Sequence, residues 1–327
     1  MIGVEELSYQ PKSNTPDVPS QRPAAIQPIW NKGILTLQNQ PANTDLKSRR
    51  FGTALRALRA EITKLADDVA GEANIDKRFV SHLRNLANQI PPKLPRQYEL
   101  FRIGHTEAVL AAYAKTVHEQ WPEFLAARYN AVALQFDRTM RQSQLWREFK
   151  RNAEHERFTV EQVAAAAPLA DGIVKALRTD ELKELFDPAI PHALTELVEP
   201  LRASRAAGSD FREEVVEAKS SELAYDVVES VNNILKRIAE AAFAVRGVFG
   251  KASRTIGHAA NEYGKGLSER LPKAFGKLGR EHGDKLPKLI FRLVTGGTVA
   301  GVSIPYIIEK FPEAFSWLQR VLTLFHQ

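Results

Sequence analysis

Residues 227–248, VVESVNNILKRIAEAAFAVRGV, carry the longest regular pattern in the chain. Apolar residues, mostly β-branched or small, recur there at alternating spacings of four and three, which is a heptad pattern lasting about three heptads. We expect one long helix over 210–248, opened by the acidic residues Asp210 and Glu213 in the manner of a capping box. The side chains predicted to pack against another helix are those of Val231, Ile234, Ile238 and Val245.

Helical periodicity also extends upstream of this helix, from about residue 46. Apolar residues follow the i, i+3, i+4 spacing within each segment, and prolines or glycines separate the segments. No hairpin signature or series of β-rich segments interrupts them, so the sequence predicts an all-α fold with a multi-helix body over 46–205. We expect its helices near 46–71, 75–90, 97–119, 122–157, 160–178, 180–187 and 189–203, followed by a linker at 206–210.

Residues 1–45 differ in composition, with six prolines and many Ser, Asn and Gln residues. Such a segment buries too little apolar surface to offset the entropy lost on ordering, so we expect a mostly disordered arm. Residues 26–37, around Trp30, are less polar. This part either docks on the body, binds a protein partner as a short motif, or adds a strand or turn to the fold.

The positive charge of the chain is concentrated in one segment. The 45 Lys and Arg residues exceed the 39 Asp and Glu residues, which gives a formal net charge of +6. Residues 1–230 carry a net charge of −2, residues 231–292 carry +8, and the residues after them are neutral in sum. Charge asymmetry of this kind is typical of contact with nucleic acid or with an anionic membrane surface.

The C-terminal region, residues 249–327, combines most of this basic segment with many glycines and a long apolar stretch. Its first part predicts basic amphipathic helices of the kind that bind membrane surfaces. Leu289 to Ile308 then spans 20 residues with Arg292 as the single charge. As a helix this stretch would cover about 30 Å, the thickness of the bilayer core. The predicted membrane contacts are Lys273, Lys277, Arg280, Lys285, Lys288, Arg292, Phe315, Trp317 and Phe325.

Two glycines within the apolar stretch favour close helix packing. Gly297 and Gly301 have the G-x-x-x-G spacing with which membrane helices approach one another. Two other interpretations of 289–308 remain open: a buried helix of a soluble bundle, or a helix sheltered in the body and released by a trigger.

The sequence contains no motif for catalysis, for a cofactor or for a metal ion. Without cysteine, the chain has no disulfide, no zinc–thiolate site and no thiol nucleophile. It has no Walker loop, no H-E-x-x-H and no G-x-S-x-G elbow, and its eight histidines are scattered. We therefore expect a non-enzymatic protein without cofactor or metal. The alternative is an all-α enzyme whose acid and base groups come from distant helices.

These patterns favour a helical protein whose basic, glycine-rich C-terminal region binds or inserts into a membrane. Its sharpest form is an oligomeric membrane-perturbing effector, of a toxin or defence type, restrained by the N-terminal helical body. The alternatives are a nucleic-acid-binding protein that uses residues 231–292 and a soluble, self-associating helical scaffold. Because residues 1–12 lack the features of a signal peptide, we expect a cytoplasmic protein that reaches the membrane through its C-terminal region.

Overall fold

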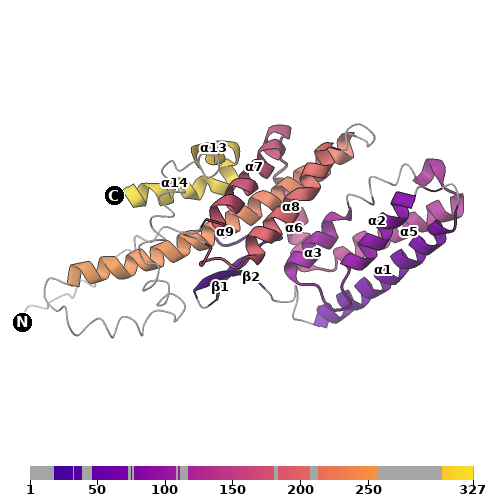
Figure 1. Ribbon diagram of the computed structural model, residues 1–327, viewed down its shortest axis with the longest axis horizontal. Coiled ribbons are helices and arrows are strands. Elements are labelled where there is room, and N and C mark those ends of the chain that lie inside the picture. Colours follow the sequence, from indigo (N-terminus) through magenta and orange to yellow (C-terminus); the bar gives the residue numbers. More distant parts are fainter. Residues whose placement is uncertain are drawn as a thin grey trace, which may run out of the picture.

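Helices dominate the computed structural model, which confirms the predicted all-α class. The structure describes residues 18–31, 33–38, 46–72, 75, 77–107, 110, 117–179, 183–206, 213–255 and 304–326. Figure 1 shows an elongated arrangement, with α1, α2 and α5 at one end and α7, α8, α9, α13 and α14 towards the other. The elements are β1 (Pro28–Asn31), β2 (Ile34–Leu37), α1 (Leu46–Ala70), α2 (Lys77–Gln89), α3 (Gln97–His105), α5 (Glu123–Met140), α6 (Gln144–His155), α7 (Val160–Leu177), α8 (Ala189–Ala206), α9 (Glu213–Thr255), α13 (Ile304–Lys310) and α14 (Pro312–His326).

The helices α1, α2 and α5 pack on one another as a small bundle. An aromatic group closes its core, where the ring centroids of Phe79 and Trp121 lie 4.6 Å apart in an edge-to-face pair and Tyr129 lies 5.8 Å from Trp121. Edge-to-face pairs of this kind add to the stability gained from burial alone. Helices α3 and α6 then connect this bundle to α9.

Helix α9 lies at the centre of the other end, in contact with α6, α7, α8, α14 and β1. The heptad side chains of Val231, Ile234 and Ile238 are in its core. The rest of its circumference is covered as well, since nearly all residues from Leu223 to Ala241 are buried. A helix buried on all sides differs from the one-sided seam that a heptad pattern predicts.

Part of the predicted N-terminal arm is built into the fold. Strands β1 and β2 form an antiparallel hairpin in which Pro28 pairs with Leu37 and Asn31 with Ile34. Gly33 lies in its turn with a φ of 86°, a left-handed conformation that favours glycine. Of the three options for this part, the structure shows two, because it adds a strand pair to the fold and this pair docks on α8 and α9. Residues 1–17 and 39–45 lie outside the described residues.

Three expected helices differ from the observed ones. The single helix over 122–157 is wrong, because α5 ends at Met140 and Ser143 caps a new helix, α6, by accepting a bond from the Trp146 N–H. The expected helix over 97–119 is interrupted, because α3 ends at His105 and a turn at Thr106 separates it from the helical residues 107, 110 and 117–120. Residues 183–188 are not helical, because Phe186 forms a β-bridge with Leu35 of the hairpin.

Candidate functional site

A stripe of polar residues runs along the buried middle of α9. Asp226, Glu229, Ser230, Asn233 and Lys236 recur at helical spacing on one face, and each is at most 2% exposed. We call this set the polar stripe. Burying such groups is costly unless each has a hydrogen-bond partner. The partners therefore show which segments the stripe holds in place.

One side of the stripe fastens the N-terminal segment 18–27, here called the strap. The Nδ2 of Asn233 donates to the carbonyls of Arg22 and Ile26, at 2.9 and 3.2 Å, and its Oδ1 accepts from the Arg22 N–H at 3.2 Å. The Nζ of Lys236 donates to the carbonyl of Ser20 at 3.0 Å. These bonds pair backbone groups of the strap that have no secondary structure of their own to pair with.

The hairpin that follows the strap is fastened to α9 in the same way. The indole N–H of Trp30 donates to the Arg237 carbonyl at 3.0 Å, and the Arg237 Nε donates to the Pro28 carbonyl at 3.1 Å. Trp30, considered above as a contact for a protein partner, thus binds within the chain in this structure.

A carboxylate–imidazole pair joins the strap, α3 and α9. The Nε2 of His105 lies 2.5 Å from Oδ2 of Asp226, whose Oδ1 accepts from the Ala25 N–H at 2.7 Å. Beside it, the Nζ of Lys150 lies 2.6 Å from Glu222. Burial alone would lower the pKa of Lys150, but the carboxylates of Glu222 and Glu107 outweigh it and raise that pKa. The His105 and Asp226 side chains are 7% and 0% exposed, so this pair fixes α3 to α9 and does not open to solvent.

A second ionic group lies nearer the C-terminal half of the stripe. Arg22 of the strap pairs with Glu156 and lies 3.8 Å from Glu229. Burial raises the pKa of Glu229, although Lys236 and Arg22 act in the opposite direction. Burial likewise lowers the pKa of Lys236. Both shifts have one cause, which is that the interior disfavours charged groups.

Next to the stripe, Asn232 fastens the C-terminal helix α14. The indole N–H of Trp317 donates to Oδ1 of Asn232 at 2.9 Å, and the Nδ2 of Asn232 donates to Glu229 at 3.2 Å. On α13, Ile307 and Ile308 are buried, and Phe311, which follows it, lies 5.4 Å from Phe158 between ring centroids.

Helix α7 provides the polar contacts to α13. The Nε2 of Gln162 donates to the Lys310 carbonyl at 2.8 Å, and the Nζ of Lys310 lies 3.1 Å from Glu161. The central helix α9 and its neighbour α7 therefore hold both the strap and the α13–α14 pair on one body.

The residues expected to contact a membrane fall into two groups. Phe315 and Trp317 are 0% and 3% exposed and belong to the core in this structure, so either could reach a membrane only after α14 had left α9. The side chains of Phe325 and Val245 lie outside the described residues, although their backbones belong to α14 and α9. Also outside the described residues are Lys273, Lys277, Arg280, Lys285, Lys288 and Arg292, and the two glycines Gly297 and Gly301.

The apolar stretch 289–308 reaches the described residues only at its end. There α13 begins at Ile304, and Ile307 and Ile308 pack inside the body. Among the helices of the described residues, none combines the length and the apolar character needed to cross a bilayer.

Two cations of the basic segment 231–292 serve internal contacts. Lys236 is buried and holds the strap, and Arg237 pairs with Glu240 at 2.7 Å. Neither is therefore available to a phosphate in this structure. A lipid or nucleic-acid contact by this segment would depend on the cations after α9.

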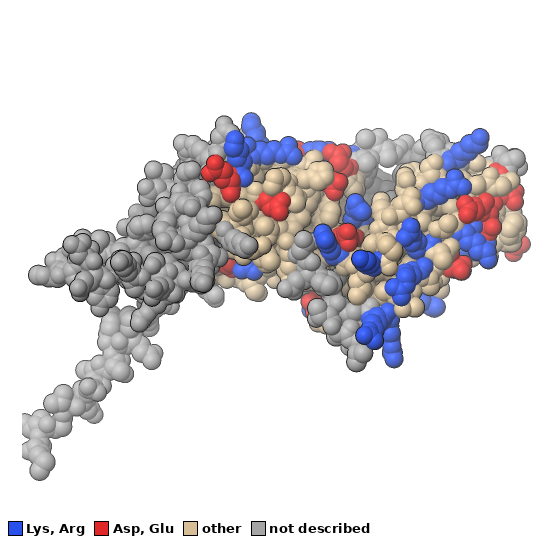
Figure 2. All heavy atoms as spheres, turned by 60° about the horizontal axis from the view of Figure 1, so that its bottom comes forward, with Lys and Arg blue, Asp and Glu red and all other residues tan. Residues whose placement is uncertain are grey.

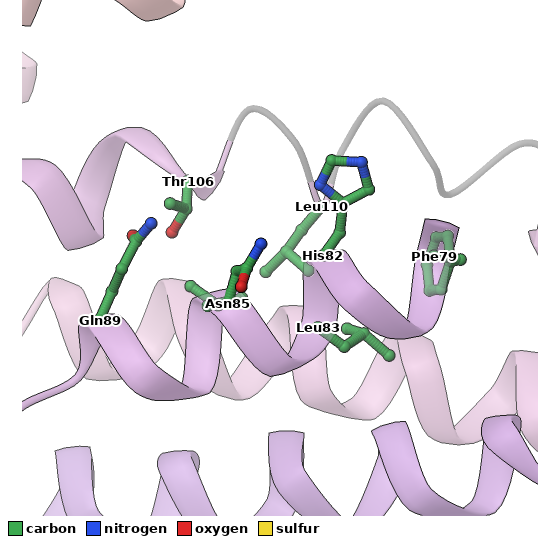
Figure 3. A pocket seen from close by; sticks show the side chains of 8 residues that line it. Phe79, His82, Leu83, Asn85, Gln89, Thr106 and Leu110 are labelled. Carbon is green, nitrogen blue, oxygen red and sulfur yellow. The ribbon is translucent and has the colours of Figure 1, made fainter. Parts of the chain in front are cut away.

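A cavity of about 160 Å³ lies between α2 and the end of α3 (Figure 3). In Figure 3 the side chains of Gln89 and His82 rise from α2, and those of Thr106 and Leu110 face them. The Oε1 of Gln89 is buried without a hydrogen-bond partner. The volume suits a few water molecules at about 30 Å³ each. His82 is the only ionisable side chain in the described lining, so the cavity offers no acid–base pair.

Sequence reasoning did not identify the polar stripe. A signal was present, because its members follow helical spacing, but such a stripe normally indicates the solvent face of a helix. Within the described residues no group of His, Asp and Glu side chains is arranged to hold a metal ion. The buried helix α9 thus forms hydrogen bonds to two segments far apart in the sequence, the strap and α14.

Comparisons of the chain with protein-family models, with curated proteins and with solved structures give no match.

Proposed function

We propose that the protein is a non-enzymatic helical effector whose C-terminal region acts on a membrane and is restrained by the helical body. One observation carries the proposal. Helix α9 extends to Thr255, and α13 begins at Ile304. Helix α13 packs on α7, and α14 packs on α9. Residues 256–303 between α9 and α13 contain eight Lys and Arg side chains and most of the apolar stretch. This membrane-candidate segment thus follows directly on α9, and at its C-terminal end it is attached to the body through α13 and α14.

The fastening at the C-terminal end is a small unit. It consists of the short helices α13 and α14, held by the buried Trp317–Asn232 bond and the partly exposed Lys310–Glu161 pair. Exposed pairs of this type contribute little to stability, because solvent screens them. Small units at the edge of a body open locally at lower free energy than the body unfolds.

Opening of α13–α14 has a direct consequence for membrane contact. It would release one end of 256–303 and expose Phe315 and Trp317, and tryptophan is enriched at the bilayer interface. The basic side chains of 256–303 would then attract anionic lipid, and Gly297 and Gly301 would allow released copies to pack closely in the membrane.

Vesicle flotation tests the proposal with the full chain and vesicles that contain about one third phosphatidylserine, enough for a negative surface potential. The variant Trp317→Phe keeps the aromatic ring but leaves Oδ1 of Asn232 unpaired, so we expect it to weaken the docking of α14 and to increase vesicle binding severalfold. Trp121→Phe is the matched control, because it makes the same change in the α1–α2–α5 bundle. Equal binding by both variants contradicts the restraint.

The membrane contact itself is tested by charge removal. The variant Lys273→Gln/Lys277→Gln/Arg280→Gln should lose most binding, whereas Arg151→Gln/Lys175→Gln/Arg178→Gln removes the same charge from exposed positions of the body and should bind like the parent. If the parent and Trp317→Phe both fail to float with anionic vesicles, the proposed function is wrong.

A further inference from the structure

Helix α1 has an unusual distribution of charge along its length. Residues 46–60 contain five Lys and Arg residues and no Asp or Glu, whereas residues 61–72 contain four acidic residues and one lysine. A helix is stabilised by acidic groups near its N-terminus and by basic groups near its C-terminus. The order in α1 is the reverse, so the stability of the helix does not explain it.

The two halves also differ in how their charges are compensated. On the acidic half, Asp67 lies 3.1 Å from the guanidinium of Arg84 in α2, and Asp68 pairs with Arg128 in α5. On the basic half, Arg49, Arg50, Arg56 and Arg59 form no ion pair within the part of the chain that the structure describes. The acidic half is thus matched by neighbouring helices, and the basic half is not.

The loop before α3 brings further cations to the basic half. Gly52 of α1 faces Leu94, and a Cβ placed on Gly52 would lie 3.4 Å from the Leu94 side chain. This contact sets the loop beside α1, with Lys93 and Arg96 exposed on it. Arg49 and Arg56 are exposed two helical turns apart and so lie on one face of α1.

We call Arg49, Arg56, Lys93 and Arg96 the α1 basic surface. Figure 2 shows Lys and Arg side chains gathered over the lobe built by α1 and α2, with acidic side chains concentrated towards its far end. The acidic residue that follows this loop in the sequence is Glu99 of α3. Its carboxylate accepts a hydrogen bond from the Arg96 N–H at 2.8 Å and stabilises the start of α3.

The residues around this surface indicate which polyanion fits it. The exposed large apolar side chains of the described residues lie on other elements, so the surface has no apolar anchor for insertion into a bilayer. It has no exposed aromatic ring either, and stacking on such rings is how single strands are bound. Three of its four cations are arginines, whose planar guanidinium groups bind phosphate with two hydrogen bonds.

We propose that the α1 basic surface binds the phosphate backbone of duplex nucleic acid, without sequence preference. Contacts to phosphates position a protein on a duplex but do not read the bases. The interaction is independent of the membrane proposal, because it uses residues of the lobe that contains α1 and α2, whereas α13 and α14 pack on α7 and α9 (Figure 1).

Fluorescence anisotropy with the full chain and two labelled 20-base-pair DNA duplexes of unrelated sequence tests this proposal. We expect both duplexes to bind equally, with a log–log salt slope of about −3 to −4 for three or four phosphates contacted. The variant Arg49→Gln/Arg56→Gln/Lys93→Gln should weaken binding at low salt about tenfold or more and reduce the slope by about 3.

Two controls keep the test specific. The body variant Arg151→Gln/Lys175→Gln/Arg178→Gln removes the same charge and should bind within about twofold of the parent. The C-terminal variant Lys273→Gln/Lys277→Gln/Arg280→Gln should lose less than the α1 variant does. No binding by the parent at low salt, a loss no greater than in either control, or binding to anionic vesicles in place of duplex through the α1 surface would overturn the proposal.

Discussion

Trp317 of α14 donates its indole N–H to Oδ1 of Asn232, 2.9 Å away, at the middle of α9. Both residues are nearly inaccessible, at 3% and 2% exposure. The amide of Asn232 donates in turn to Glu229 of the polar stripe. Because water cannot replace either partner, removing one leaves the other unpaired at a cost that exceeds the net value of the bond.

The variant Asn232→Ala therefore reports on the docking of α14. We expect it to lower the free energy of unfolding by about 1–3 kcal/mol, because the Trp317 N–H and the Glu229 carboxylate lose a buried partner. Hydrogen exchange of the α13 and α14 amides should also become faster. Asn85→Ala, at an exposed position of α2, is the matched control. Exchange in α14 that is the same in both variants contradicts this role of Asn232.

Two helical glycines should respond in opposite ways to the same substitution. A Cβ on Gly104 would lie 2.3 Å from the Trp146 ring, whereas a Cβ on Gly52 would meet the Leu94 side chain at 3.4 Å. Gly104→Ala should destabilise the protein by about 3 kcal/mol, because α3 and α6 have to move apart. Gly52→Ala should be neutral or stabilise by up to about 1 kcal/mol, since alanine favours the helix. Urea unfolding measures both, and similar losses in the two variants would show that the α3–α6 contact is less close than described.

The elements that the sequence predicted well are those with strong apolar periodicity. Helix α1 was expected near 46–71 and extends over Leu46–Ala70, and α7 was expected near 160–178 and extends over Val160–Leu177, where Thr159 and Gln162 form a capping box. Local patterns suffice in these places, because the helix and its cap are made by residues close in sequence.

The features that sequence reasoning missed depend on residues far apart. The polar stripe of α9 has the spacing of a solvent-facing stripe, and it is buried because residues far away in the sequence cover it: the strap, more than 200 residues earlier, contacts Asp226 and Asn233, and His105 also contacts Asp226. The break between α5 and α6 was a local signal that went unused, since Ser143 is a good N-cap residue. Averaging the charge over residues 1–230 also concealed the basic half of α1.

The burial of Glu229 predicts a dependence of stability on pH. Its pKa is raised in the folded protein, so the folded state binds the proton more tightly than the unfolded state does. The stability due to this group is greatest below its ordinary pKa of 4.5 and falls as the pH rises through the raised pKa. Lys236, whose pKa is lowered, acts at alkaline pH, where its contribution to stability grows with rising pH towards 10.5.

Glu229→Gln should remove the loss of stability that accompanies the ionisation of Glu229 as the pH rises, while keeping an acceptor for Asn232. Thermal unfolding of the variant and the parent at pH values from 4.5 upwards measures this, and the variant's advantage should grow with pH. The carboxylate also lies 3.8 Å from Arg22, so the variant leaves that guanidinium with Glu156 as its partner. Glu154→Gln, at an exposed position of α6, is the matched control. A difference between variant and parent that stays constant with pH would mean that Glu229 ionises in the folded protein as it does in the unfolded chain.

The attachment of the strap to α9 should depend strongly on Asp226. Its two carboxylate oxygens contact the Ala25 N–H and the His105 imidazole, and Asp226→Ala leaves both without this partner. We expect a loss of about 2–5 kcal/mol in the free energy of unfolding, as for other buried groups deprived of a charged partner. Cleavage by thermolysin within residues 18–31, identified by mass spectrometry, should become faster at a denaturant concentration where the parent is intact. Asp171→Ala, which removes an exposed partner of Arg202, should cost at most about 1 kcal/mol and leave this cleavage unchanged. If the two variants are cleaved in the strap at the same rate, Asp226 does not hold the strap.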